Sequence, residues 1–152
     1  MNIYEILNRE SISIGLKAEG KEELIDRLLD LAENSGKIDN HEEARKEIFA
    51  RENIMSTGVG KGIALPHAKT KAVQDSVASM AIMPEPIDFE AVDGEPVDLA
   101  FLILGRENNV GTHLRLLSKI SRLLNTENFR GELTNCKSED EVLKLFEKVE
   151  NE

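Results

Sequence analysis

The chain is 152 residues long and carries a formal charge of −10, from 29 acidic and 19 basic side chains. This length is typical of one domain with its own apolar core, and 40% of the residues are hydrophobic. The negative charge opposes non-specific attraction to nucleic acid and to anionic lipid, which both require cationic surfaces. We therefore expect a single domain over residues 1–152 and no nucleic-acid partner.

Three further features exclude other classes of protein. The longest uninterrupted apolar run is Leu99–Leu104, which is far shorter than the roughly 20 residues of a membrane helix. The start of the chain lacks the basic and then apolar pattern of a signal peptide, so we expect a cytoplasmic location. The single cysteine, Cys136, has no second thiol for a disulfide or a zinc cluster, and we expect it to be inert.

The first third of the chain predicts a strand followed by two helices. Residues 12–16 alternate apolar with small or polar side chains, as a half-buried strand does. Apolar side chains recur at helical spacing over residues 21–34 and predict a helix there. Asn40 and Glu43 have the spacing of a capping box. A second helix is therefore expected to start at Asn40 and to end near residue 52.

The middle of the chain predicts a tight turn and three short strands. Three of the ten glycines fall within residues 56–62, where backbone freedom or close approach is needed. The nearly continuous apolar run of residues 97–104 indicates a strand buried on both faces, so we expect it at the centre of a sheet. Prolines are expected to end the other two strands, which are residues 63–65 and 77–83.

Two more helices complete the pattern and define the fold class. Thr112 is expected to cap a helix that continues to Leu124, with His113 in its first turn. Ser138 begins a second capping-box pattern before a C-terminal helix. Strands interleaved with helices at short spacing predict an α/β protein, a three-layer α/β/α sandwich with a mixed central sheet flanked by helices.

The sequence lacks the motifs of several common nucleotide-binding, metal-binding and hydrolytic sites. Residues 58–62 read Gly-Val-Gly-Lys-Gly, but a P-loop needs Ser or Thr after its lysine, and a dinucleotide loop needs a wider spacing of its last two glycines. The histidines and Cys136 are scattered singly, without the paired spacing of a zinc site. No Gly-x-Ser-x-Gly elbow of a hydrolase occurs. His41 follows a helix cap among glutamates, and we assign it no function.

His67 is the strongest candidate for chemistry. It follows the glycine-rich turn in Leu-Pro-His-Ala-Lys, and residues 51–71 carry four basic side chains against one acidic one. A neutral imidazole is a usable nucleophile toward a phosphoryl group, and nearby cations stabilise the charge of the transition state. The pattern therefore favours a phosphohistidine, and a surface histidine at a strand end is the alternative.

Two motifs of the chain have counterparts in a known family. The first comprises Arg51-Glu52, Ser56 to Gly58, Val59-Gly60 and Ile63 to Ala68, and the second comprises Gly111 to Leu114 with Leu117. They resemble the phosphorylation site and the second histidine motif of the fructose/mannitol-type enzyme IIA family (EIIA type 2). This family belongs to the bacterial phosphoenolpyruvate-dependent sugar phosphotransferase system, and the likeness runs over nearly the whole chain.

The resemblance implies that His67 accepts phosphate on its Nε2 atom from the phosphocarrier protein HPr and passes it to an enzyme IIB domain, without a metal or organic cofactor. His113 would support the reaction from the positive end of its helix, and Arg51 would hold a phosphoryl oxygen with its planar guanidinium. Thr57 is expected to hydrogen-bond the phosphate. The alternatives are that His113 is a helix-surface histidine, that Arg51 forms a salt bridge to Glu52 or to a helix carboxylate, and that Thr57 caps the local backbone.

The resemblance also implies an indirect association with a membrane enzyme IIC, which would recognise the sugar. The segments after His113 and over residues 84–98 favour the fructose branch. Exposed apolar residues near His67 are expected to dock HPr, while Lys61 and Lys69 steer a partner or solubilise a loop. A nitrogen-type regulatory enzyme IIA and a non-catalytic module of the same fold are the rival interpretations. We expect a monomer, because no heptad repeat occurs.

Overall fold

The computed structural model describes residues 1–152. It contains six α-helices, one short 3₁₀-helix and six strands. In chain order these are α1 (Ile3–Ile6), η1 (Arg9–Ser11), β1 (Ile12–Ile14), α2 (Lys21–Glu33), α3 (His41–Ile54), β2 (Gly58–Gly60), β3 (Ile63–Ala64), β4 (His67–Thr70), β5 (Val77–Ile87), β6 (Val97–Arg106), α4 (Val110–Leu124), α5 (Glu127–Thr134) and α6 (Glu139–Glu150).

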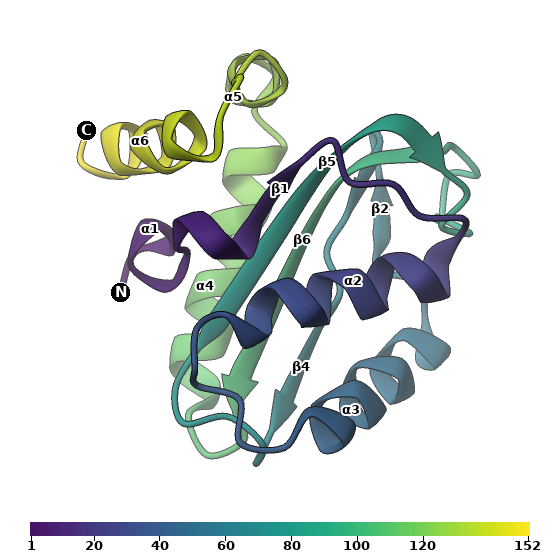
Figure 1. Cartoon of the computed structure of the whole chain (residues 1–152), viewed down its shortest axis with the longest axis vertical. Helices are drawn as coiled ribbons and strands as arrows, with labels where there is room; N and C mark the ends of the chain where they lie inside the picture. The colour runs from purple at the N-terminus through teal and green to yellow at the C-terminus, as the bar shows by residue number, and fades with distance from the viewer.

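The sheet lies between two layers of helices (Figure 1). Helices α2 and α3 pack on one face, where Leu28 and Ile48 join Leu104 of β6 in one apolar cluster. Helices α1, α4, α5 and α6 pack against the other face, where Leu116 and Phe146 join a second cluster. The predicted three-layer α/β/α sandwich with a mixed sheet is therefore confirmed. No helix is long and apolar enough to cross a membrane.

Strand β6 is the centre of the sheet, as its apolar run predicts. The strand order is β1-β5-β6-β3-β2, and β4 also pairs with β6. One edge of β6 runs antiparallel to β5, and the other edge runs parallel first to β3 and then to β4. Strands β3 and β4 are therefore two stretches along the same edge of β6, separated only by Leu65 and Pro66.

Most of the predicted strands end one or two residues away from the expected position, and the predicted glycine-rich turn contains strand β2. Two larger differences concern β4 and β5. His67 was expected just beyond a strand end, but it is the first residue of β4, because β6 continues to Arg106 and offers it a pairing edge. Strand β5 was expected to end before Pro84, but it continues to Ile87. Its pairing with β6 is irregular between Ile82 and Ile87, where Pro84 is exposed, so the missing N–H costs no ladder hydrogen bond.

Two of the three predicted helix caps are confirmed. The side-chain oxygen of Asn40 accepts a hydrogen bond from the backbone N–H of Glu43 at 3.1 Å, at the start of α3. The Ser138 hydroxyl accepts one from the backbone N–H of Glu141 at 3.2 Å, at the start of α6. The cap predicted at Thr112 is wrong. Helix α4 starts at Val110, because the N–H of His113 already donates to the Asn109 carbonyl at 3.2 Å. His113 stays in the first turn.

Helices α1 and α5 were not predicted. Helix α1 is only four residues long and has little local stability of its own. It is held by the Glu150 carboxylate, which accepts hydrogen bonds from the N–H groups of Ile3 at 2.6 Å and Tyr4 at 2.8 Å. Helix α5 buries only Phe129 and Leu133. Helix α1 therefore depends on a contact with the far end of the chain, while α5 packs against its neighbours α4 and α6.

Candidate active site around His67

The backbone around Pro66 gives His67 its orientation. Proline has no N–H to donate, and its carbonyl accepts from the N–H of Ile103 in β6 at 3.1 Å. The preceding carbonyl, that of Leu65, is left free for the histidine. The Nδ1 atom of His67 lies 2.7 Å from this oxygen. The break between β3 and β4 thus creates the acceptor that fixes the ring.

This contact determines the tautomer of His67. A carbonyl oxygen only accepts hydrogen bonds, so Nδ1 must carry the proton and donate it to Leu65. In the neutral ring the Nε2 atom then holds the free lone pair. Burial lowers the pKa of His67, and the charge of Arg51 acts in the same direction, against the hydrogen bond to Leu65 and the charge of Glu52. The ring is therefore neutral near pH 7, with Nε2 as its nucleophilic atom.

His113 lies beside His67 and is buried, with only 3% of its surface exposed. The two ring centroids are 6.0 Å apart, and the planes are tilted by 45°. Burial, together with the charges of His67 and Lys69, lowers the pKa of His113 to about 4. Its Nδ1 atom is buried and makes no hydrogen bond within the protein. Two neutral imidazoles thus meet where β4 faces α4, which excludes a helix-surface position for His113.

Gly105 makes room for the His113 ring. It is paired with Lys69 across the β4–β6 ladder, on the same face as His67. A Cβ atom at this position would lie 2.9 Å from Cγ and 3.1 Å from Cβ of His113. Both are closer than ordinary van der Waals contact. The histidine pair therefore requires glycine at position 105.

Arg51 lies in the last turn of α3 and is half-buried. Its Nη1 atom donates a hydrogen bond to the backbone carbonyl of Met55 at 3.0 Å. Its charge also acts on His67, where it lowers the pKa. The guanidinium keeps further N–H donors, because one contact uses only part of its planar fork. Arg51 forms no salt bridge with Glu52, which pairs with Lys21, or with any helix carboxylate, so the structure gives no support to that alternative.

Thr57 is buried, and its polar groups point at Glu52. Its backbone N–H lies 2.7 Å from one oxygen of that carboxylate, and its hydroxyl donates to the other. Glu52 also forms a salt bridge with Lys21 of α2, at 3.1 Å. The hydroxyl that was expected to hydrogen-bond a phosphate is thus engaged inside the protein.

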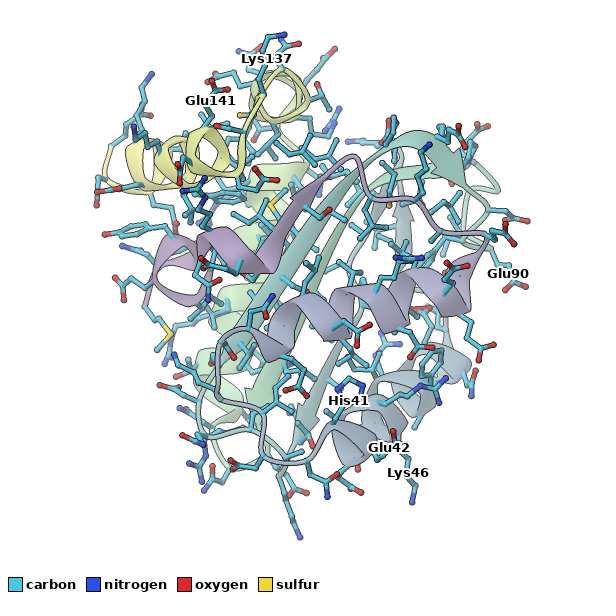
Figure 2. All side chains as sticks on the ribbon, in the orientation of Figure 1. His41, Glu42, Lys46, Glu90, Lys137 and Glu141 are labelled. Carbon is cyan, nitrogen blue, oxygen red and sulfur yellow. The ribbon has the colours of Figure 1, made fainter.

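The remaining candidates are the lysines Lys61 and Lys69 and the histidine His41. Lys69 is exposed and two residues from His67, so both side chains project from the same face of β4. Lys61 lies in the turn between β2 and β3, and its ammonium donates to the side chain of Asn125 at 3.3 Å. His41, which is labelled in Figure 2, is the first residue of α3 and contacts Glu33 at 2.8 Å.

The structure contains no group of three or more His, Cys, Asp or Glu side chains that could hold a metal ion. His67 and His113 come together, but His41 lies apart and pairs with a carboxylate. Cys136 is half-buried, its thiol donates to the Glu132 carbonyl at 3.3 Å, and burial raises its pKa. A raised pKa leaves the thiol protonated and unreactive.

Exposed apolar side chains occur in the segments of the chain that carry the site residues. Five of them lie on the stretches that adjoin Arg51 or His113 in the sequence, and each is more than 40% exposed. They are Ile54, Met55, Val59, Val110 and Leu114. Apolar side chains gathered at the surface around a polar centre are typical of protein interfaces.

Sequence reasoning missed three parts of the site. The Leu65 carbonyl gave no signal, because its availability depends on how β3 and β4 pair with β6. Gly105 had a signal that was not used, since a glycine directly after an apolar strand core often marks a close approach. The pairing of Lys21 with Glu52 joins residues 31 positions apart and had no local signature.

Residues 5–149 match the family described as "Phosphoenolpyruvate-dependent sugar phosphotransferase system, EIIA 2". The chain belongs to this family, as the motifs around His67 predicted. Proteins of this class are components of a phosphotransferase system.

Two curated relatives carry fructose-specific names. The chain is 38% identical over 148 residues to the "PTS system fructose-specific EIIA component" of Haloferax volcanii, and the match covers 97% of this chain and 96% of that protein. It is 34% identical over 146 residues to the "PTS system fructose-specific EIIABC component" of Bacillus subtilis, which covers 96% of this chain. The match spans only 23% of that longer protein.

Solved structures show the same fold. The nitrogen regulatory protein IIA-Ntr from Neisseria meningitidis superposes with a TM-score of 0.87 at 33% identity, covering 95% of this chain and 98% of that one. Enzyme IIA mannitol from Escherichia coli, in complex with phosphorylated enzyme IIB mannitol, gives a TM-score of 0.79 at 26% identity, covering 93% and 97%. The fold is thus found in relatives with metabolic names and in relatives with regulatory names.

Proposed function

We propose that this protein is a cytoplasmic phosphoryl carrier, with His67 as the residue that is phosphorylated. The observation that carries the proposal is the hydrogen bond from Nδ1 of His67 to the Leu65 carbonyl, because it leaves the Nε2 lone pair free. Phosphohistidine of HPr would be the donor. The Nε2 lone pair forms the new N–P bond while the N–P bond of the donor breaks, and the donor nitrogen recovers its electron pair. Transfer to an enzyme IIB domain is the same exchange with a new acceptor.

Arg51 and His113 would stabilise the phosphoryl group during transfer. The group carries negative charge on its three outer oxygens, and catalysis consists mainly of positioning and electrostatic stabilisation. Arg51 offers a fixed positive charge with free N–H donors. His113 is neutral, so it would donate a single hydrogen bond rather than add charge. Thr57 would contact the phosphate only through a hydroxyl that now donates to Glu52, so we give it the least direct role.

The exposed apolar residues beside the site support docking of protein partners. Ile54 is 81% exposed and Met55 64% exposed, directly after the helix that carries Arg51. A donor and an acceptor of one phosphoryl group must both reach Nε2, so we propose that HPr and enzyme IIB use this surface in turn. Association with a membrane enzyme IIC would then be indirect, through enzyme IIB.

Fructose-type uptake is the branch that we propose first, because the Haloferax volcanii relative of nearly equal length carries a fructose-specific name. Nitrogen-type regulation is the second candidate. It is favoured by the TM-score of 0.87 with the nitrogen regulatory protein from Neisseria meningitidis. In that case the same phosphohistidine would control protein binding instead of feeding a transporter. Faster phosphoryl transfer to a fructose-type enzyme IIB than to water would favour the first branch.

The test is the intact mass of the protein after incubation with phosphoenolpyruvate, enzyme I and HPr. We expect one added phosphoryl group that is labile in acid, as phosphohistidine is. His67→Ala is expected to abolish it. His41→Ala is the matched control, since His41 is a partly exposed histidine outside the site, and it should leave the addition unchanged. Full phosphorylation of the His67→Ala protein would contradict the assignment.

A further inference from the structure

Glu52 is a buried carboxylate next to the site that the proposed chemistry does not use. Its side chain is only 2% exposed. The backbone N–H and the hydroxyl of Thr57 both donate to it, and the ammonium of Lys21 lies 3.1 Å from its Oε2 atom. Lys21 is itself placed over the ring of Phe89, 5.0 Å from the centroid. Because a buried charge is costly unless it is paired, such a fully bonded carboxylate holds its surroundings firmly.

The contacts of Glu52 connect it to the guanidinium of Arg51. Glu52 fixes Thr57, which is two residues after Met55 in the segment that leaves α3. The carbonyl of Met55 is the acceptor that holds Nη1 of Arg51, at 3.0 Å. Arg51 and Met55 are themselves four residues apart, at the end of the helix. The orientation of the guanidinium therefore depends on a backbone segment that Glu52 ties down at its far end.

We infer that Glu52, together with Lys21, is a positioning residue for Arg51 in phosphoryl transfer. Glu52 does not touch the phosphate. It anchors Thr57, so that the Met55 carbonyl stays where it orients the Arg51 fork. This inference rests on the proposed function of His67 and adds to it a buried ion pair that links α2, α3 and the start of β2. It also gives the Thr57 hydroxyl a role inside the protein, in place of direct contact with the phosphate.

The physical reason is that an arginine aids transfer only in a narrow range of geometries. A small misplacement of a positioning group costs about tenfold to a hundredfold in rate. A segment without fixed contacts after a helix end has many conformations, and free motion of residues 55–57 would spread the guanidinium over several positions. The buried carboxylate of Glu52, paired with Lys21, removes that freedom before the phosphoryl donor binds.

The test compares two buried glutamates of similar surroundings. Glu52→Gln keeps the shape of the side chain, but its amide nitrogen cannot accept from Lys21 or Thr57. Glu150→Gln is the matched control, because Glu150 is also 2% exposed, accepts two backbone N–H groups and lies 3.7 Å from Lys119. Lys21→Met is a second way to break the same ion pair. Thermal unfolding of each variant shows that it is folded.

The first measurement is the order of the Arg51 side chain, from the heteronuclear NOE of its Nε–H group in labelled protein. We expect this NOE to fall in Glu52→Gln and Lys21→Met and to stay at the wild-type value in Glu150→Gln. This readout does not depend on phosphorylation. An unchanged NOE in both Glu52→Gln and Lys21→Met would overturn the inference even if His67 is phosphorylated.

The second measurement is the rate of phosphorylation by excess phosphorylated HPr. We expect Glu52→Gln to be about tenfold slower and Glu150→Gln to match the wild type. If Glu52 acts through Arg51, the Arg51→Gln/Glu52→Gln double variant is no slower than Arg51→Gln alone. If the double variant loses as much rate as the two single variants combined, the inference is contradicted. A wild-type protein that takes no phosphate, with the NOE changes as expected, would refute the proposed function and leave the positioning intact.

Discussion

Replacing Gly105 with alanine tests the packing that holds His113 beside His67. The added methyl carbon would lie 2.9 Å from Cγ and 3.1 Å from Cβ of the His113 ring. Both partners sit in regular structure, β6 and the first turn of α4, so the clash cannot be relieved by a flexible side-chain end. We expect the free energy of unfolding to fall by about 1–3 kcal/mol, as in other overpacked sites. In a domain of this size that lowers Tm by roughly 2–10 °C.

The assay is thermal unfolding by circular dichroism, with a thermodynamic cycle. His113→Ala removes the ring that collides with the new methyl group, so the Gly105→Ala change should cost much less in that background. Gly131→Ala is the control, because an added Cβ there meets nothing within 4 Å and the residue lies in α5. That change should be neutral or raise stability by about 0.5–1 kcal/mol. An unchanged Tm in Gly105→Ala, or an equal loss with and without His113, would refute the packing argument.

Substitutions at Asn40, His113 and Arg51 test a helix cap, a buried neutral histidine and the guanidinium fork. Asn40→Ala should lower the free energy of unfolding by about 1 kcal/mol, measured by urea denaturation, because the Glu43 N–H loses its cap; an unchanged midpoint would contradict the cap. The pKa of His113 is about 4 in the folded protein and about 6.5 when unfolded, so the unfolded chain takes up the proton first. Its contribution to stability is therefore complete above pH ~6.5 and lost between pH ~6.5 and ~4. The drop in urea midpoint from pH 7 to pH 5 should be smaller in His113→Ala, and an equal drop would exclude His113 as the source. Arg51→Lys keeps the charge but loses the planar fork, and should slow phosphorylation roughly tenfold or more; wild-type rates would show that charge alone suffices.

Local patterns in the sequence were enough to predict most of the large elements. Apolar side chains at helical spacing predict the helices α2, α3 and α6. The caps at Asn40 and Ser138 predict where α3 and α6 begin. Strand β6 follows from its apolar run, because only a central strand buries both faces. Strand β4 was missed, since four residues after Pro66 form a strand only where β6 extends far enough to pair with them. Helix α1 was missed because its anchor, Glu150, lies 147 residues away from Ile3.

Some features of the candidate site could likewise be predicted from local sequence, and others depend on tertiary contacts. His67 could be predicted as the candidate for phosphorylation, because its motif is continuous in sequence, and this role stays a prediction. The state of its ring could not, because the Leu65 carbonyl becomes available only when the strand breaks at Pro66. The pairing with His113 depends on Gly105, which lies on a different strand. Thr57 was expected at the phosphate because of its place in a motif, but the buried Glu52 carboxylate holds its hydroxyl.

The identity of the phosphorylated atom tests the proposed role of His67 most directly. A two-dimensional ¹H–¹⁵N spectrum of the histidine rings, recorded before and after phosphorylation of ¹⁵N-labelled protein, distinguishes Nε2 from Nδ1. The hydrogen bond from Nδ1 of His67 to Leu65 predicts a phosphoryl group on Nε2 of His67, with the Nδ1 proton retained and the other two histidines unmodified. A phosphoryl group on Nδ1 of His67, or on His113, would contradict the account.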